Sequence, residues 1–122
     1  FRGKSCGGEV EKNASTSIDF KVESCKWLFS GAEAIYENSV LGDSVSVSIV
    51  DKDNVFGAGE NTILDTFLSA WYLNPEHKSS KVDLTYAGKL PLGVYIRFTY
   101  KSIGMVTNPT FLVNLFIHER ID

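Results

Sequence analysis

The sequence predicts an all-β protein, an antiparallel β-sandwich of jelly-roll-like type with one short helix inserted between its strands. Several segments alternate apolar and polar residues with a period of two, which is typical of strands with one buried face. Turn residues separate these segments at short intervals. Within residues 51–75 alone, the period becomes helical. The length of 122 residues suits a single domain with a single core.

Residues 1–13 are rich in glycine and charge and show no hydrophobic periodicity. We expect them to form an extended N-terminal arm, either ordered against a partner or without fixed structure. Residues 14–122 are expected to form the single β-sandwich domain. Because the chain begins at Phe1 and its one methionine is Met105, we expect a processed product or an excised piece.

The first half of the domain contains three strand-like segments. Residues 17–24 and 43–50 are apolar at every second position, so one face of each strand should be buried. Residues 26–36 are interrupted by Ser30-Gly31, which indicates a bend or bulge. The residues expected to enter the core are Ile18, Phe20, Val22, Trp27, Phe29, Val45, Val47 and Ile49.

The apolar residues between Asp51 and Pro75 recur with helical spacing. Thr62 precedes Asp65 by three residues, which resembles a capping box, and Pro75 disfavours helical geometry in the residue before it. We therefore expect a short helix that closes one end of the sandwich. Its buried face should consist of Ile63, Leu64, Phe67, Leu68 and Trp71, which lie at i, i+1, i+4, i+5 and i+8.

The second half is expected to form strands over residues 81–86, 94–101 and 111–118, with a turn at residues 87–89. In residues 94–101, one face consists of Val94, Ile96, Phe98 and Tyr100 and should enter the core. The other face consists of Tyr95, Arg97 and Thr99 and is expected to pair beside the last strand. Residues 102–110 contain glycine and proline and are expected to make a hairpin connection. The last strand is apolar on both faces, so it should be central or covered by another segment or a neighbouring subunit. Its two faces contain Phe111, Val113, Leu115 and Ile117, and Leu112, Asn114, Phe116 and His118.

The charge pattern argues against two classes of partner. Twelve basic residues are scattered among 15 acidic ones, and the net charge is −3, whereas nucleic-acid binders usually gather basic residues on one face. No apolar run approaches the roughly 20 residues that span a bilayer. We therefore expect neither nucleic acid nor membrane as a partner.

Cys6 and Cys25 are the two cysteines. They could form one disulfide between the N-terminal segment and the first strand, and two free thiols are equally compatible with a reducing compartment. Neither cysteine belongs to a CxxC motif. With only two histidines besides, a structural zinc site is not expected.

The chain offers no catalytic constellation. His77 lies in a polar loop and His118 ends a strand, and nothing around either suggests a triad. No G-x-S-x-G motif occurs. We therefore expect a non-enzymatic protein without catalytic residues, cofactor or metal.

The acid-rich turn at Asp51 and Asp53, with Glu60 and Asp65 nearby, is the strongest candidate for a cation site, because carboxylates spaced by two residues can converge on calcium. It lacks the ligand spacing and the glycine of an EF-hand loop. The favoured interpretation is a solvated turn in which Asp51 or Asp53 accepts hydrogen bonds from its own backbone.

Exposed aromatic residues could form a sugar-stacking platform, although Trp27 and Trp71 are better explained as core residues. Arg97 could stack on its aromatic neighbours or simply be solvated. The aromatic candidates for a platform are Trp27, Trp71, Tyr72, Tyr86 and Tyr95.

Three segments resemble small β-sandwich virion proteins of tailed bacteriophages. They are V-D-x-D at Val50 to Asp53, L-D-x-F-x-x-x-W-Y at Leu64 to Tyr72, and G-x-Y-x-R-x-x-Y at Gly93 to Tyr100. The resemblance covers most of the chain. It implies a structural role in the phage particle, as a cement or decoration protein or another head or tail component, and it carries over no catalytic residue.

The expected function is therefore that of a structural virion protein, located in the virion, which contacts copies of itself as a homo-oligomer and other virion proteins. The alternative is a carbohydrate-binding module excised from a larger secreted protein. That alternative predicts a row of exposed aromatic side chains and an oxidised Cys6–Cys25 pair.

Overall fold

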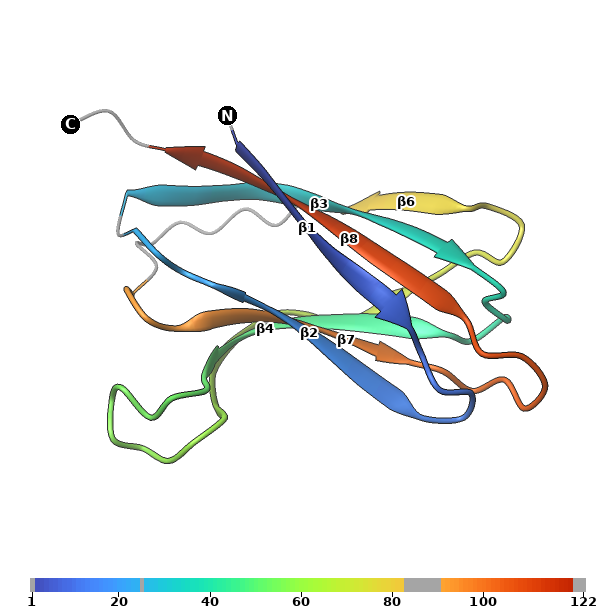
Figure 1. Cartoon of the computed structure of the whole chain (residues 1–122), viewed down its shortest axis with the longest axis horizontal. Coiled ribbons are helices and arrows are strands. Elements are labelled where there is room, and N and C mark those ends of the chain that lie inside the picture. Colours follow the sequence, from blue (N-terminus) through green and yellow to red (C-terminus); the bar gives the residue numbers. More distant parts are fainter. Residues whose placement is uncertain (1, 25, 83–90, 120–122) are drawn as a thin grey trace.

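The protein is a two-layer antiparallel β-sandwich (Figure 1). The computed structural model describes residues 2–24, 26–82 and 91–119, and these ranges contain strands and no helix. The strands are β1 (Arg2–Glu9), β2 (Ser15–Lys21), β3 (Trp27–Glu37), β4 (Ser44–Asp51), β5 (Thr62–Tyr72), β6 (Ser79–Val82), β7 (Tyr95–Lys101) and β8 (Thr110–Glu119).

The strand order identifies the topology. One sheet has the order β1-β8-β3-β6 and the other has the order β2-β7-β4-β5. The pairs β1–β8, β2–β7, β3–β6 and β4–β5 are all antiparallel, as if one long hairpin had been wrapped around a barrel. Eight strands in this order form a jelly roll, so the predicted β-sandwich is confirmed.

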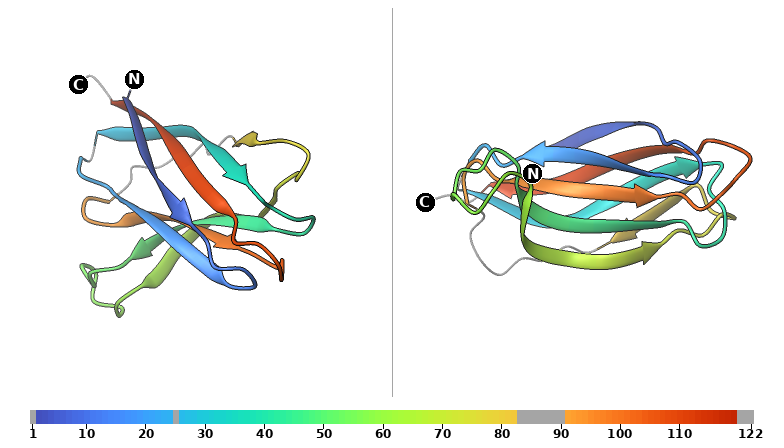
Figure 2. Two further views of the ribbon diagram at one scale, coloured as in Figure 1. Left: turned by 45° about the vertical axis from the view of Figure 1, so that its right-hand side comes forward. Right: turned by 90° about the horizontal axis from the view of Figure 1, so that it is seen from below.

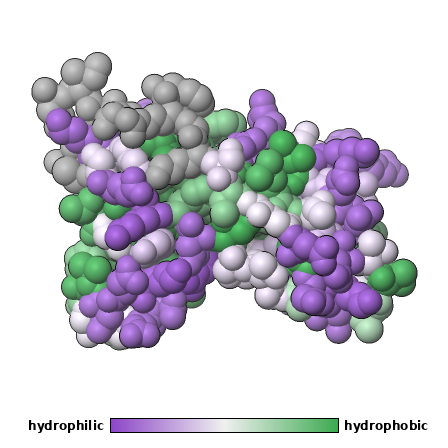
Figure 3. Space-filling model, in the orientation of Figure 1, coloured by the Kyte–Doolittle hydropathy of each residue, from purple (hydrophilic) through white to green (hydrophobic). Residues whose placement is uncertain are grey.

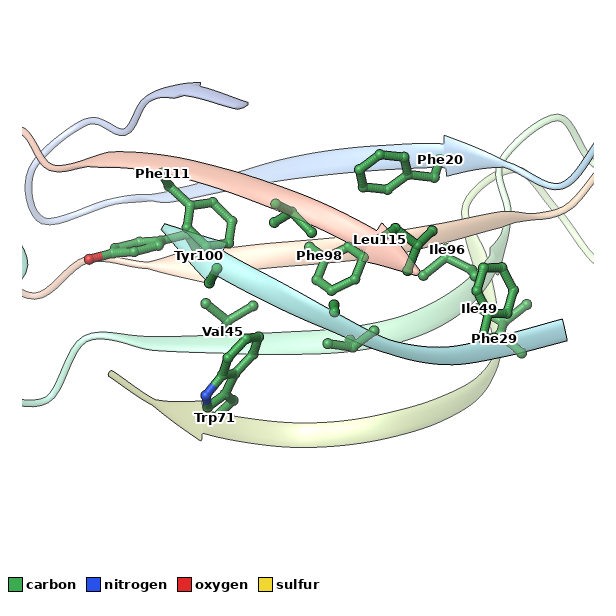
Figure 4. Packing of buried hydrophobic residues seen from close by; sticks show 14 of the residues in the cluster. Phe20, Phe29, Val45, Ile49, Trp71, Ile96, Phe98, Tyr100, Phe111 and Leu115 are labelled. Carbon is green, nitrogen blue, oxygen red and sulfur yellow. The ribbon is translucent and has the colours of Figure 1, made fainter. Parts of the chain in front are cut away.

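The core lies between the two sheets and follows the predicted alternation (Figure 4). Rings from both layers meet there: Tyr100 of β7 packs edge-on against Phe111 of β8, with their centroids 5.1 Å apart. Edge-on packing brings the positive rim of one ring to the negative face of the other. The predicted inward residues with exposures of 6 % or less are Phe20, Val22, Trp27, Phe29, Val45, Val47, Ile49, Val94, Ile96, Phe98, Tyr100, Phe111, Val113, Leu115 and Ile117.

The predicted bend at Ser30-Gly31 is confirmed, because the register between β3 and β8 shifts between Phe29 and Gly31. The last strand was expected to be either central in its sheet or covered, and a central position is observed. β8 lies between β1 and β3, and the side chain of Leu112 on its outer face is 36 % exposed.

The predicted helix between Asp51 and Pro75 is wrong. Thr62–Tyr72 form strand β5, at the edge of its sheet beside β4. β5 advances ten residues from Thr62 to Tyr72 while β4 advances seven from Asp51 back to Ser44. β5 therefore carries three extra residues, at three register shifts. Each extra residue interrupts the period of two, so the apolar residues of β5 recur with a spacing close to that of a helix.

The expected burial of this segment is correspondingly only partial. Trp71 is 9 % exposed, but Ile63 and Leu64 are 61 % and 41 % exposed. Phe67 and Leu68 are half-buried and pack against the core, so the second half of the edge strand β5 reaches over the core and its first half does not.

The predicted hairpin connection over residues 102–110 is also wrong. β7 belongs to one sheet and β8 to the other, so this segment crosses between the layers. The outer face of β7 consequently lies beside β2 and β4, rather than beside β8. Alternation specifies which residues are buried but carries no information about which sheet a strand joins.

The N-terminal segment is extended, and its partner is the chain's own β8. Arg2–Glu9 form β1, which pairs with β8 without a register shift. A Cβ atom at Gly7 would lie 2.6 Å from the Cα atom of Leu112, so the glycine permits the close approach of the two strands. The expected strand at residues 81–86 corresponds in part to β6, and residues 83–90 with the turn lie outside the described residues.

Candidate functional site

The acid-rich turn after β4 is held together by hydrogen bonds to the backbone. Asp51 is fully buried, and its Oδ1 and Oδ2 atoms accept hydrogen bonds from the N–H groups of Val55 and Phe56, at 2.7 and 2.9 Å. The carboxyl oxygen of Asp53 accepts a hydrogen bond from the Tyr95 hydroxyl at 3.1 Å. The backbone hydrogen bonds of the turn interpretation are therefore present at Asp51, but this residue is buried rather than solvated.

The other acids of the candidate cation site do not converge with these two. Asp65 is exposed and accepts a hydrogen bond from the N–H of its neighbour Thr66, at 2.8 Å, and Glu60 is exposed. In residues 2–24, 26–82 and 91–119, no group of three or more His, Cys, Asp or Glu side chains could hold a metal ion.

Arg97 is an ion-pair residue rather than a stacked or solvated cation. Its Nε and Nη2 atoms donate to the two carboxyl oxygens of Asp19, at 2.8 and 3.0 Å. Nη2 also donates to Oδ1 of Asn61, at 3.0 Å. Such a two-pronged pair fixes geometry as well as charge, so it ties β2 to β7 and to the start of β5 on the outer face of the sheet.

Lys52 extends this polar cluster. Its Nζ atom lies 3.3 Å from Oδ2 of Asp19 and 5.2 Å from the centroid of the Tyr95 ring. Burial acts to raise the pKa of Asp19, but hydrogen bonds and charge from Arg97 and then from Lys52 outweigh it, and the pKa lies below its usual value of 3.8. The hydrogen bond to Asp53 raises the pKa of Tyr95.

The four aromatic candidates that lie within the described residues do not form a platform on one face. Trp27 and Trp71 are 3 % and 9 % exposed, Tyr72 is 71 % exposed, and Tyr95 contacts Lys52. Tyr86 lies outside the described residues. The two tryptophans are therefore core residues, as expected.

A second group of hydrogen bonds centres on Asp43, which directly precedes β4. Its side chain is 1 % exposed. Oδ2 accepts hydrogen bonds from the Tyr100 hydroxyl at 2.6 Å and from the N–H of Val40 at 3.2 Å, while Oδ1 accepts one from the N–H of Ile103 at 3.0 Å. One buried carboxyl group thus joins the β3–β4 loop, the β7–β8 loop and strand β7.

Tyr100 provides the link from this group to the core. Its ring packs among the buried residues, and its hydroxyl points out of that cluster toward the end of the sandwich (Figure 4). Burial, and then the hydrogen bond to Asp43, raise the pKa of Tyr100 well above 10. The hydroxyl is therefore a neutral donor across the physiological range.

The two loops joined by Asp43 expose apolar side chains. A Cβ atom at Gly104 would lie 3.3 Å from both γ-carbons of Val40, and one at Gly42 would overlap with Cδ1 of Ile103, so the loops are in contact. We name the exposed apolar residues of these loops the apolar loop surface. They are Val40, Leu41, Ile103, Met105 and Val106, with exposures of 39, 84, 45, 69 and 86 %.

The opposite end of β4 repeats the arrangement on a smaller scale. The loop held by Asp51 exposes Val55 and Phe56, at 55 and 54 %. Gly93, at φ 89°, lies against Val55, where an added Cβ atom would be 3.5 Å from Cγ2. Figure 3 shows hydrophobic surface at both ends of the molecule.

Sequence reasoning did not single out Asp43, because its partners Tyr100 and Ile103 lie 57 and 60 residues away. The apolar loop surface had a visible signal. Leu41, Met105 and Val106 interrupt otherwise polar, glycine-containing connections, where buried packing is not expected.

Of the remaining candidates, Cys6 is a free, exposed thiol, and Cys25 lies outside the described residues. His77 and His118 are both exposed. None of the described residues forms a helix of the length and apolarity that crossing a membrane requires.

No protein-family model and no curated protein matches the chain. Two solved structures are similar to it in fold. One is a structure of infectious bursal disease virus, Gx strain, with 8 % identity, 98 % of this chain and 30 % of that chain covered, and a TM-score of 0.48. The other is the VP2 subviral particle of infectious bursal disease virus, with 10 % identity, coverages of 98 % and 42 %, and a TM-score of 0.36.

The chain therefore spans less than half the length of either of these two proteins. Both TM-scores lie below 0.5, so neither likeness bears on the function of this chain.

Proposed function

We propose that this chain is a non-enzymatic structural protein of a bacteriophage particle, a cement, decoration or other head or tail component. It acts by contact with copies of itself and with other virion proteins, and requires neither nucleic acid nor membrane. The observation that carries the proposal is the apolar loop surface, because clustered apolar side chains on an exposed surface mark sites of protein association.

The way in which these residues are held supports a docking role. A loop that folds upon binding loses conformational freedom, which weakens association. Here the hydrogen bonds of Asp43 to Val40, Ile103 and Tyr100 fix both loops beforehand. The apolar loop surface is therefore preorganised for a partner.

The phage assignment rests on the sequence resemblance. The three segments that carry it fall on the end of β4, on β5, and on β7 with the two residues before it, and these strands are neighbours in one sheet. The jelly-roll fold is compatible with the assignment, but it occurs in lectin domains as well as in viral capsids. The choice between these classes therefore depends on the surface.

The surface favours protein contact over carbohydrate. Sugar platforms use exposed aromatic rings, and here Trp27 and Trp71 are buried, while the apolar loop surface contains aliphatic side chains and a methionine. Methionine and aliphatic groups suit a protein partner better than a sugar ring.

The test is quantitative mass spectrometry of purified particles of the phage that encodes the chain. We expect the chain in a fixed copy number, and a strong loss of incorporation for the double variant Leu41→Ser/Val106→Ser. The matched control Ile63→Ser removes a side chain that is 61 % exposed on β5 and should be incorporated normally. Absence of the chain from particles, together with binding in a glycan screen, would overturn the proposal.

A further inference from the structure

The edge strands of the two sheets differ in how well they are protected. β5 is interrupted by its three register shifts, and β6 has only four residues. β1 pairs with β8 over eight residues and β2 with β7 over seven, both without a shift. A long regular edge can template a further strand, whereas bulges and short strands prevent it. β1 and β2 are therefore the edges suited to strand addition.

The two lateral sides of the sandwich also differ: the edges β5 and β6 are linked to each other, whereas the side between β1 and β2 is open. On the side of β5 and β6, Nε1 of Trp71 donates to Oγ of Ser80 at 3.1 Å, which links the two edges. Between β1 and β2 the sandwich is open and holds a cavity of about 390 Å³, lined among others by Gly8, Ile18 and Phe111. β1 forms the outer rim of this side in the right-hand view of Figure 2.

The backbone direction along β1 follows from one hydrogen bond. The N–H of Val10 donates to the carbonyl of Pro109, opposite it, at 2.8 Å. Because hydrogen bonding alternates along an antiparallel pair, the even-numbered residues of β1 bond to β8. The odd-numbered residues direct their N–H and C=O groups to the free edge. They are Gly3, Ser5, Gly7 and Glu9.

We propose that β1 is the interface to a second copy of this chain, paired antiparallel across a two-fold axis so that the two β1–β8 sheets become continuous. Hydrogen bonds across the axis require odd residues opposite odd residues. The register centred on Cys6 uses the whole free edge. It places Gly3 opposite Glu9 of the second copy and Ser5 opposite Gly7 of the second copy.

Charge argues for a second copy as the occupant. The segment is basic at one end and acidic at the other, with Arg2 and Lys4 followed by Glu9 and Glu11. Antiparallel pairing sets the basic end of one strand beside the acidic end of the other. Because the basic residues are even-numbered and the acidic ones odd-numbered, they occupy opposite faces of the strand, so the attraction acts between strand ends rather than between directly opposed residues. In the register centred on Cys6, no like charges lie directly opposite, which would destabilise the pair. This interface is separate from the apolar loop surface and is tested separately.

The first test is the mass of the full chain by light scattering in reductant. Ser5→Pro removes an N–H that faces the free edge and leaves the pairing with β8 intact, since proline is tolerated at that kind of position. We expect a dimer for the native chain and a dissociation constant raised at least about tenfold in Ser5→Pro. Ser5→Ala, which also loses the side-chain contact to Asn114 but keeps the N–H, should remain dimeric.

The second test uses the native thiol and needs no disruption of the fold. In a Cys25→Ser background, the two copies of Cys6 face each other, so mild oxidation should link them into a disulfide dimer. Moving the thiol by one residue, with Ser5→Cys and Cys6→Ser, places the two thiols diagonally with Cα atoms about 7–8 Å apart, beyond disulfide reach. That variant should not cross-link.

Two results would overturn the inference. An oligomer that survives Ser5→Pro and does not cross-link through Cys6 would mean that copies meet through another surface, which leaves the proposed function standing. A monomer at all concentrations, whether or not another polypeptide adds to the β1 edge, would remove the second copy as its occupant.

Discussion

Strand β4 carries a buried aspartate at each end, and the two ends are built differently. Asp43 accepts hydrogen bonds from Val40, Tyr100 and Ile103, which belong to three separate segments. Asp51 accepts hydrogen bonds from Val55 and Phe56 of the loop that follows it. Both hold loops that expose apolar side chains, but only Asp43 joins distant parts of the chain.

This difference separates a local turn from a structural junction. A turn such as that of Asp51 needs only its own loop in order to form. The junction at Asp43 requires that β4, β7 and two loops are already in place, and in return it fixes their relative positions. Substitution of Asp43 should therefore destabilise the core together with the two loops. Substitution of Asp51 should loosen only the loop that follows it.

Asp43→Ala should produce the largest effect. It leaves the Tyr100 hydroxyl and two loop N–H groups without their acceptor, which corresponds to about 3–5 kcal/mol of unfolding free energy. Denaturant titration measures this loss. Hydrogen exchange should also accelerate in both loops of the apolar loop surface. A loss of unfolding free energy below about 1 kcal/mol would contradict the role of Asp43 as a junction between the two loops and β7.

Asp51→Ala should have a smaller and more local effect. Two backbone N–H groups lose their acceptor, which corresponds to about 1–3 kcal/mol. Limited proteolysis should detect faster cleavage within residues 52–61, with the Asp43 end unchanged. Equally faster cleavage at both ends of β4 would contradict the independence of the Asp51 loop from the Asp43 junction.

Tyr100→Phe should cost about 1 kcal/mol at neutral pH, because it removes one of the hydrogen bonds to Asp43. The pH dependence gives an independent check. The pKa of Tyr100 is raised in the fold, so above about pH 10 the unfolded chain releases a proton that the folded chain retains. Stability should fall with rising pH there, and less steeply in Tyr100→Phe. Parallel alkaline limbs would contradict the raised pKa.

Asp19→Asn should have the smallest effect, about 1 kcal/mol or less, because the pair with Arg97 is partly exposed. The folded pKa of Asp19 is depressed, so its contribution is present above about pH 4 and is lost as the pH falls through the folded pKa. Acid titration of unfolding should show a flatter limb below pH 4 in Asp19→Asn than in the native chain. An unchanged limb would rule out this contribution.

The sequence predicted the inward residues of β2, β3, β4, β7 and β8, since alternation depends only on which side chains meet the core. It failed at β5, where three extra residues disturb the period. It also missed the pairing of β1, because a glycine-rich strand carries no alternation and is defined by its partner β8.

The site was less accessible to prediction than the fold. Asp51 was singled out correctly as a turn residue, because its partners lie within five residues. Asp43 has the same residue type and a similar position relative to β4, but its partners are set by the jelly-roll topology. Only the folded chain brings Tyr100 and Ile103 to it.

The most direct test of the account is a measurement of binding to purified phage particles, carried out on the Ser5→Pro chain so that the β1 edge is blocked. In that background we compare Leu41→Ser/Val106→Ser at the Asp43 end with Val55→Ser/Phe56→Ser at the Asp51 end. Particle binding that is lost only with the first pair, with folding unchanged by circular dichroism, is the result that we expect. Particle binding that persists without Leu41 and Val106 would contradict the role of the apolar loop surface, as would a Ser5→Pro chain that does not bind phage particles.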